Sequence, residues 1–158
     1  MTTIRLRFES ELATSAEAIL AAAMTMPGVN AELMPLIRMT YPAQYRDLDA
    51  QQAPLNTVLF RSWLLLFGVV PVDVHALAFD RLYDNGFDER SSSLLHRVWI
   101  HRRRVEAIDG GARVIDELEF EPRLSLAAGF DRYTVTQTFA HRHRRLRRRY
   151  GLRSAGRT

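Results

Sequence analysis

One carboxylate in this sequence is predicted to face a hydrophobic core. In residues 112–123, Val114, Asp116, Leu118 and Phe120 occupy alternate positions, and Arg113, Glu117, Glu119 and Glu121 lie on the other face. This alternation is typical of a strand with one buried face. A buried carboxylate without a partner costs several kcal/mol, so we expect Asp116 to be paired.

The turn before this strand predicts the partner. Asp109 and Gly110 separate two strand-like segments and form the strongest hairpin signal in the chain. With the turn at these two residues, the preceding strand places three side chains on the same face as Asp116: Arg103, His101 and Trp99. A register shift of one residue would instead turn another set inward: His96, Val98 and Ile100.

Two interpretations of this polar cluster are open. In the first, the cluster orients an oxygen of a ligand or moves a proton, and His101 and Asp116 are the candidate catalytic residues. In the second, Arg103 and Asp116 form a buried ion pair that fixes the strand register.

Other chemistries have little support. His141 and His143 are two positions apart on a predicted helix, so their side chains point about 200° apart and cannot chelate one ion. The serines at 91–93 lack the G-x-S-x-G context of a hydrolase nucleophile. No phosphate-binding loop or dinucleotide fingerprint occurs. We therefore expect no metal and no cofactor.

The elements that position these residues begin with a strand. Residues 2–12 alternate between apolar and charged side chains. Thr14 and Glu17 have capping-box spacing and predict a helix that ends near Met24. A single helical turn is expected at Ala31–Met34, before Pro35.

The middle of the chain is rich in strand formers. Pro42–Pro54 is predicted to be a surface loop or flap. Strands are expected at Leu36–Tyr41 and Val72–Tyr83. The apolar run Val58–Val70 is expected to be a buried strand, with a helix as the alternative. Phe87–Ile108 is expected to form two short strands or one bent strand.

A long helix should follow. From about Phe130 to Tyr150, apolar side chains recur every three or four residues, and Gly151 is a suitable stop. At about 30 Å, this helix is long enough to cover one face of an antiparallel sheet. The order of elements predicts an α+β fold.

Length and composition predict a single domain, residues 1–150, with a basic tail at 151–158. A hydrophobic fraction of 47% is typical of an ordinary globular protein. The absence of cysteine fits a reducing compartment. No apolar run approaches the roughly 18 residues of a membrane span. We expect a cytoplasmic protein.

The positive charge is concentrated at one end. All 22 basic residues are arginine, and eight of them lie in the last 18 positions, where no acid occurs. Such a stretch binds phosphates of nucleic acid or an anionic membrane surface, or forms a solvated helix face. Aromatic residues for base stacking are nearly absent, so nucleic acid is the less favoured partner.

Several motifs together resemble the SRPBCC superfamily, also called START-like or polyketide cyclase/dehydrase-like. They are F-x-S-x-L at Phe8–Leu12, P-G-x-N at Pro27–Asn30, W-x-H at Trp99–His101, G-G-x-x-V-x-D-x-L-x-F at Gly110–Phe120 and F-x-H-R-H at Phe139–His143. The last motif resembles a bacterial subgroup with mostly uncharacterised members. The segment Thr40–Pro54 is longer than the superfamily pattern.

The resemblance implies a helix-grip fold, in which a curved antiparallel sheet wraps around the C-terminal helix. Members bind lipids, steroids or polyketides between sheet and helix, and a minority are cyclases or dehydrases. We expect a binding protein, monomeric or homodimeric, more than an enzyme. The candidate ligand-binding residues are Phe8, Trp63, Trp99, His101, Arg103, Asp116, Leu118, Phe120, Val135 and Phe139.

Overall fold

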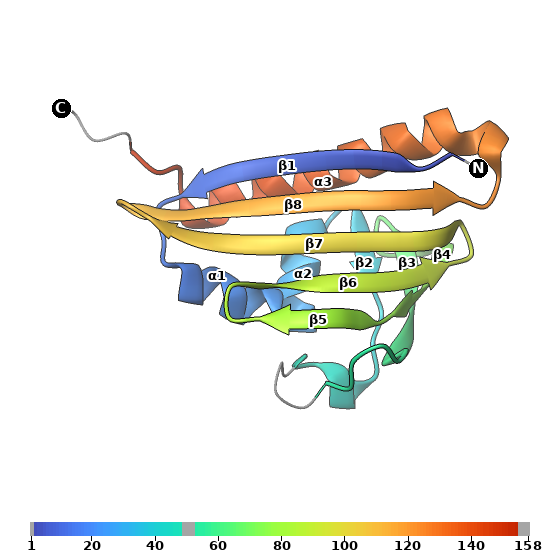
Figure 1. Ribbon diagram of the computed structural model, residues 1–158, viewed down its shortest axis with the longest axis horizontal. Coiled ribbons are helices and arrows are strands. Elements are labelled where there is room, and N and C mark those ends of the chain that lie inside the picture. The colour runs from blue at the N-terminus through green and yellow to red at the C-terminus, as the bar shows by residue number, and fades with distance from the viewer. Residues whose placement is uncertain (1, 49–52, 155–158) are drawn as a thin grey trace.

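The structure, a computed structural model, describes residues 2–48 and 53–154 (Figure 1). One strand and two short helices come first: β1 Ile4–Leu12, α1 Ala16–Ala23 and α2 Met26–Leu33. The other strands are β2 Ile37–Met39, β3 Phe60–Leu66, β4 Val70–Leu77, β5 Phe79–Tyr83, β6 Gly86–Ser93, β7 His96–Ile108 and β8 Gly111–Pro122. The long helix α3, Ala128–Tyr150, follows β8, and two 3-10 turns are present: η1 Ala43–Tyr45 and η2 Ser125–Ala127.

The strands form one antiparallel sheet in the order β1-β8-β7-β6-β4-β3-β2, and β5 pairs with β6 beside this path. The predicted α+β helix-grip architecture is confirmed, because the sheet curls around α3. The hairpin of β7 and β8 turns at Asp109 and Gly110, as predicted. Gly110 has a φ of 76°, which glycine adopts without strain.

The register of this hairpin is also confirmed. Arg103 pairs with Asp116, and the pairs His101–Leu118 and Trp99–Phe120 follow. A bulge between His96 and Val98 adds one residue to β7 near its start. Because of this bulge, His96 and Trp99 both face the concave side of the sheet.

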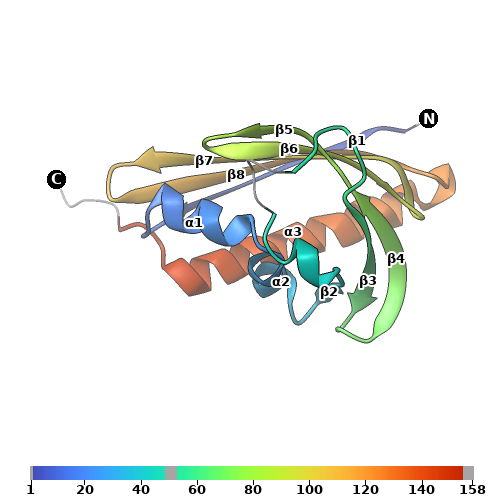
Figure 2. The same cartoon turned by 90° about the horizontal axis from the view of Figure 1, so that it is seen from below.

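The segment 72–83, predicted as one strand, bends at Ala78 and forms two. β4 pairs with β3 and with the end of β6, whereas β5 pairs with the first half of β6. Ala78 stays attached to β6, since its N–H donates to Ser91 Oγ and its carbonyl accepts from Arg90 N–H. On the β4 side of this bend, β3 and β4 turn toward the side of the sheet on which α2 and α3 lie (Figure 2).

The first two helices differ in detail from the prediction. Ser15, not Thr14, caps α1, because its Oγ accepts the N–H of Ala18. A full helix, α2, replaces the single turn expected at Ala31–Met34. It begins after Thr25, and Pro27 lies in its first turn, where proline needs no hydrogen-bond donor. The Pro-Gly pair that suggested a turn is therefore part of a helix start.

Gly28 allows α1 and α2 to approach closely. A Cβ atom at this position would lie 1.8 Å from the carbonyl oxygen of Ala22. The described part of the loop 42–54 packs on the same helices, with Leu48 N–H donating to Met24 O. Residues 49–52 of that loop lie outside the described residues.

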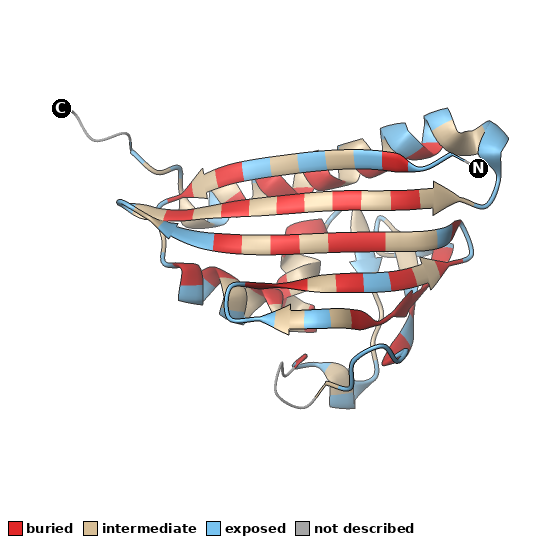
Figure 3. Ribbon diagram, in the orientation of Figure 1, coloured by how far each residue is buried: buried red, intermediate tan, exposed pale blue. Residues whose placement is uncertain are grey.

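Within the described residues the core consists of three hydrophobic clusters, and one of them lies where β1, β7 and β8 face the C-terminal half of α3. Along β8, buried residues alternate with partly exposed ones, so the predicted acidic face is the outer face (Figure 3). Helix α3 ends at Gly151, as expected, with a φ of 77°. The hydrophobic cluster at this end consists of Leu12, Ala16, Ile19, Val105, Ala112, Val114 and Leu146.

Candidate ligand-binding cavity

A cavity of about 430 Å³ lies between the bent part of the sheet and helices α2 and α3. This volume is within the range of about 300–1,000 Å³ typical of small-molecule sites. Most of its wall is apolar, and the apolar side chains include Met26, Val29, Leu33, Met39, Leu64, Leu66, Leu77, Phe79, Phe87, Trp99, Val135 and Phe139. The cavity opens beside the start of α3, where Phe130 and Tyr133 both line it and are exposed.

Asp116 lies behind the cavity wall in a closed cluster. It is fully buried, and Arg103 donates to both of its oxygens, from Nε at 2.8 Å and from Nη2 at 2.7 Å. His101 Nε2 lies 2.7 Å from Oδ1, and His143 Nε2 lies 3.0 Å from Oδ2. The predicted Arg103–Asp116 pair is therefore present, and His143 is an additional partner.

Glu32 of α2 continues this cluster toward α3. Arg103 donates to both oxygens of Glu32, at 2.7 and 3.0 Å. Arg142 of α3 donates to Oε2 of the same carboxylate from Nε and Nη2. Two buried arginines and two buried carboxylates thus join the sheet, α2 and α3, and their charges cancel.

The cluster keeps its carboxylates ionised. Burial alone would raise the pKa of Asp116, but the charges of Arg103 and His101 and their hydrogen bonds hold it well below its ordinary value. Burial likewise opposes ionisation of Glu32, and the two arginines lower its pKa. The pKa of Arg103 is raised because Asp116 and Glu32 outweigh its loss of hydration.

A second buried carboxylate, Glu89 of β6, lies at the cavity wall. Its Oε1 accepts from His75 Nε2 at 2.6 Å and from Ser91 Oγ at 2.7 Å, and its Oε2 lies 3.4 Å from His101 Nδ1. Burial opposes ionisation, but hydrogen bonds from His101 and His75 lower the pKa of Glu89 far below its ordinary value. His101 therefore contacts a carboxylate with each of its nitrogens.

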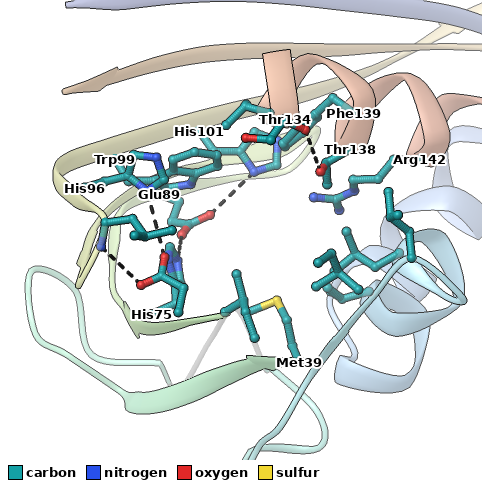
Figure 4. Close-up of a pocket in the computed structure, with 18 of the residues that line it drawn as sticks. Met39, His75, Glu89, His96, Trp99, His101, Thr134, Thr138, Phe139 and Arg142 are labelled. Atoms are coloured by element: carbon teal, nitrogen blue, oxygen red, sulfur yellow. Dashed lines mark hydrogen bonds and ion pairs between the residues drawn. The ribbon is translucent and has the colours of Figure 1, made fainter. Parts of the chain in front are cut away.

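His75 differs from His101 in one respect. Its Nε2 is held by Glu89, and Nδ1 has no hydrogen-bond partner within residues 2–48 and 53–154. His75 lines the cavity and makes an edge contact with the ring of Trp99. Figure 4 shows His75, Glu89 and His96 gathered at one side of the cavity, with Arg142 across the open space.

His96 forms the third polar group of the wall. Its Nε2 lies 2.9 Å from Oδ2 of Asp131, on α3, and its Nδ1 lies 3.2 Å from Ser93 Oγ. This Ser–His–Asp order resembles a hydrolase triad, but the Ser93 oxygen already accepts two backbone N–H groups, and Ser93 does not line the cavity. The arrangement orients His96 and does not present a nucleophile.

Half of the predicted ligand-binding residues line this cavity: Trp99, His101, Arg103, Val135 and Phe139. Four others pack behind the wall, between the sheet and α3. Leu118, Phe120 and Asp116 are almost completely buried there, and Phe8 stacks on Phe139 at 5.7 Å between ring centroids.

One predicted ligand-binding residue, Trp63, lies away from the cavity. It lies on β3, but its side chain is 51% exposed and does not line the cavity, whereas Leu64 and Leu66 do. The run 58–70, predicted as one buried strand, forms β3, a turn at 67–69 and the start of β4, and β3 is buried on one face only. Because Arg61 and Ser62 interrupt both alternate sets of an otherwise apolar run, its pattern could not tell which set faces inward.

The polar wall formed by β4, β6, β7 and α3 was not predicted, and it consists of Asp73, His75, Glu89, His96, Asp131 and Arg142. A signal was present in two strands. Asp73 and His75 are two apart, as are Glu89 and Ser91, so each pair shares a strand face. Asp131 and Arg142 gave no such signal, since charged residues surround them in the sequence.

The arginine-rich stretch 141–157 is mostly bound to the fold. Besides Arg142, Arg147 donates to Ser10 Oγ, Arg145 donates to Ala31 O, and Arg153 contacts Glu11. Arg144, Arg148 and Arg149 remain exposed. His141 and His143 point to different partners, as predicted. The last four residues of the expected tail, which include Arg157, lie outside the described residues.

Within the described ranges, no helix has the length and hydrophobicity to span a membrane. In the same residues, no three side chains of His, Cys, Asp or Glu are arranged to hold a metal ion.

The fold matches solved structures along nearly its whole length. Protein CV1439 from Chromobacterium violaceum has a TM-score of 0.69 at 13% identity, with 96% of this chain and 99% of that chain covered. A START superfamily protein from Mycobacterium smegmatis has a TM-score of 0.63 at 14% identity, covering 94% and 96%. Ara h 8.0201 has a TM-score of 0.56 at 11% identity, covering 92% and 98%.

These matches define the class. The chain has the START-like helix-grip fold, which confirms the resemblance found in the sequence. Residues 10–150 match the family described as "Domain of unknown function (DUF8410)", and the chain belongs to that family. None of the curated proteins compared with the chain matches it.

Proposed function

We propose that this protein binds a hydrophobic small molecule, such as a lipid, a polyketide or a steroid-like compound, in the cavity between the bent sheet and α3. The observation that carries the proposal is the cavity itself. It has the volume of a small-molecule site and a mostly apolar wall with polar groups at few positions. A START superfamily protein and Ara h 8.0201 share the fold, which supports the same use of the space.

A neutral fluorescent compound, N-phenyl-1-naphthylamine, tests this proposal. We expect saturable binding of one molecule per chain. In Val29→Phe, an aromatic ring enters the cavity from α2, and binding should weaken at least about tenfold. Val58→Phe is the matched control, because Val58 is exposed and does not line the cavity. Equal binding by both variants would contradict the proposal.

A second candidate function is acid–base catalysis on the bound molecule, as in a cyclase or dehydrase. It is favoured by the His75–Glu89 pair, because a buried carboxylate holds one nitrogen of His75 and leaves the other unengaged at the cavity wall. The sequence had suggested His101 and Asp116 for this role. Both nitrogens of His101 contact carboxylates, and Asp116 lies behind the wall.

The two candidates differ in one variant. In His75→Gln, a binding protein keeps most of its affinity, and no turnover is lost. An enzyme keeps its affinity as well but loses conversion of the bound compound by roughly two orders of magnitude. Mass spectrometry of small molecules extracted from the purified protein supplies the compounds for this assay.

A further inference from the structure

The charges around the cavity indicate which kind of polar group its ligand carries. Two arginines line the wall, Arg103 and Arg142, and both are used by buried carboxylates. Arg103 is shared by Asp116 and Glu32, and Arg142 donates to Glu32. The cavity therefore has no cation left to pair with an anionic ligand.

Three further carboxylates belong to the wall: Asp73, Glu89 and Asp131. Their partners in the described part of the chain are imidazoles, hydroxyls and backbone N–H groups. Counting these with the closed cluster, two positive charges stand against five negative ones when the imidazoles are neutral. Three imidazoles would need to be protonated to bring the sum to zero. With fewer than three imidazoles protonated, a ligand carboxylate would enter a site that is already negative.

The wall nevertheless offers hydrogen bonds to an uncharged group. Arg142 uses Nε and Nη2 on Glu32, and its Nη1 has no partner among the described residues, so it is a donor available to a ligand oxygen. When Nε2–H of His75 donates to Glu89, its Nδ1 accepts a hydrogen bond from a hydroxyl group. Figure 4 shows these two groups on opposite sides of the open space.

We propose that the ligand of this cavity is an uncharged apolar alcohol or ketone and not a carboxylate such as a fatty acid. This inference rests on the proposed binding function and adds the class of ligand. An alcohol or ketone satisfies Arg142 Nη1 without adding charge. A carboxylate brings a charge that must be desolvated, and no arginine of the described wall is free to compensate it.

The test compares compounds with one chain and different head groups. Decan-1-ol, decan-2-one and decanoate compete with N-phenyl-1-naphthylamine at about pH 8, where the acid is ionised. The alcohol and the ketone should displace the probe at concentrations at least about tenfold lower than the acid. Decanoate binding as tightly as the alcohol would overturn the inference.

The Glu89→Gln variant tests the electrostatic argument itself. It removes one negative charge from the wall and keeps the size of the side chain. Decanoate should gain at least about threefold in affinity relative to decan-1-ol. An unchanged ratio would mean that the wall charge does not exclude the anion. If neither the probe nor any of the three compounds binds to the native protein, the binding function itself fails, which is a different result from binding without discrimination.

Discussion

The space between the sheet and α3 has two halves: one is filled, and the other keeps a cavity beside its own packed cluster, which includes Met26, Phe60 and Phe79. In the filled half, β1, β7 and β8 lie against α1 and the C-terminal part of α3, with Leu12, Val114 and Leu146 fully or nearly fully buried. In the open half, the strands β3 and β4 bend away from the plane of the sheet at Ala78, and a cavity of about 430 Å³ remains. The backbone bend and not a change in side-chain type makes the difference.

The polar groups of the two halves differ in the same way. Asp116 is enclosed by Arg103, His101 and His143, and this cluster marks the boundary of the packed half. Glu89 has two imidazole partners, and one of them, His75, lines the cavity. Asp116 does not line the cavity and serves the fold, whereas Glu89 lines it and is available to a ligand.

Removing the closed cluster's central charge should have the largest effect on stability. Asp116→Ala leaves Arg103 and two imidazoles with fewer partners in a fully buried place. We expect a loss of about 3–5 kcal/mol in the free energy of unfolding, measured with urea. Glu117→Ala is the control, since the next residue of β8 forms an exposed pair with Arg7 and should cost less than about 1 kcal/mol. Similar losses in both variants would contradict the role given to Asp116.

The same substitution should have different consequences in the two halves. Val114→Phe adds a ring to a fully buried position and should cost about 1–3 kcal/mol of stability. Val29→Phe adds the same ring beside the cavity and should cost less, while it weakens probe binding. Chemical denaturation of both variants measures the difference. A larger loss in Val29→Phe would show that the open half is not open.

The acid dependence of stability should be smaller in Glu89→Gln. In the unfolded chain, a glutamate takes up a proton near its ordinary pKa of 4.5, whereas in the fold the partners of Glu89 hold its pKa far lower. The unfolded state thus binds more protons below about pH 4.5, and stability falls as the pH falls. Removing Glu89 should reduce this slope by up to about 1.4 kcal/mol per pH unit. Equal slopes would contradict the ionised buried state.

The sequence was sufficient for the fold and for the centre of one polar cluster, Arg103, His101 and Asp116, but not for its other members Glu32, Arg142 and His143. The turn at Asp109 and Gly110 determines the register of β7 and β8, and with it the pairing of Arg103 and Asp116. The cavity wall was not predictable to the same degree. It depends on the bend at Ala78, on the bulge after His96 and on the packing of α2, and none of these changes the periodicity of the sequence strongly.

A titration of the isotopically labelled protein with decan-1-ol, followed by ¹⁵N–¹H NMR, tests most directly whether the open half is a ligand site. We predict that the largest shift changes occur at amides of residues around the cavity, such as Leu33, Phe87 and Thr138. The amide of Val114, in the packed half, should change little. Changes confined to exposed apolar residues such as Phe67 and Val69, or no saturable change at all, would contradict this account.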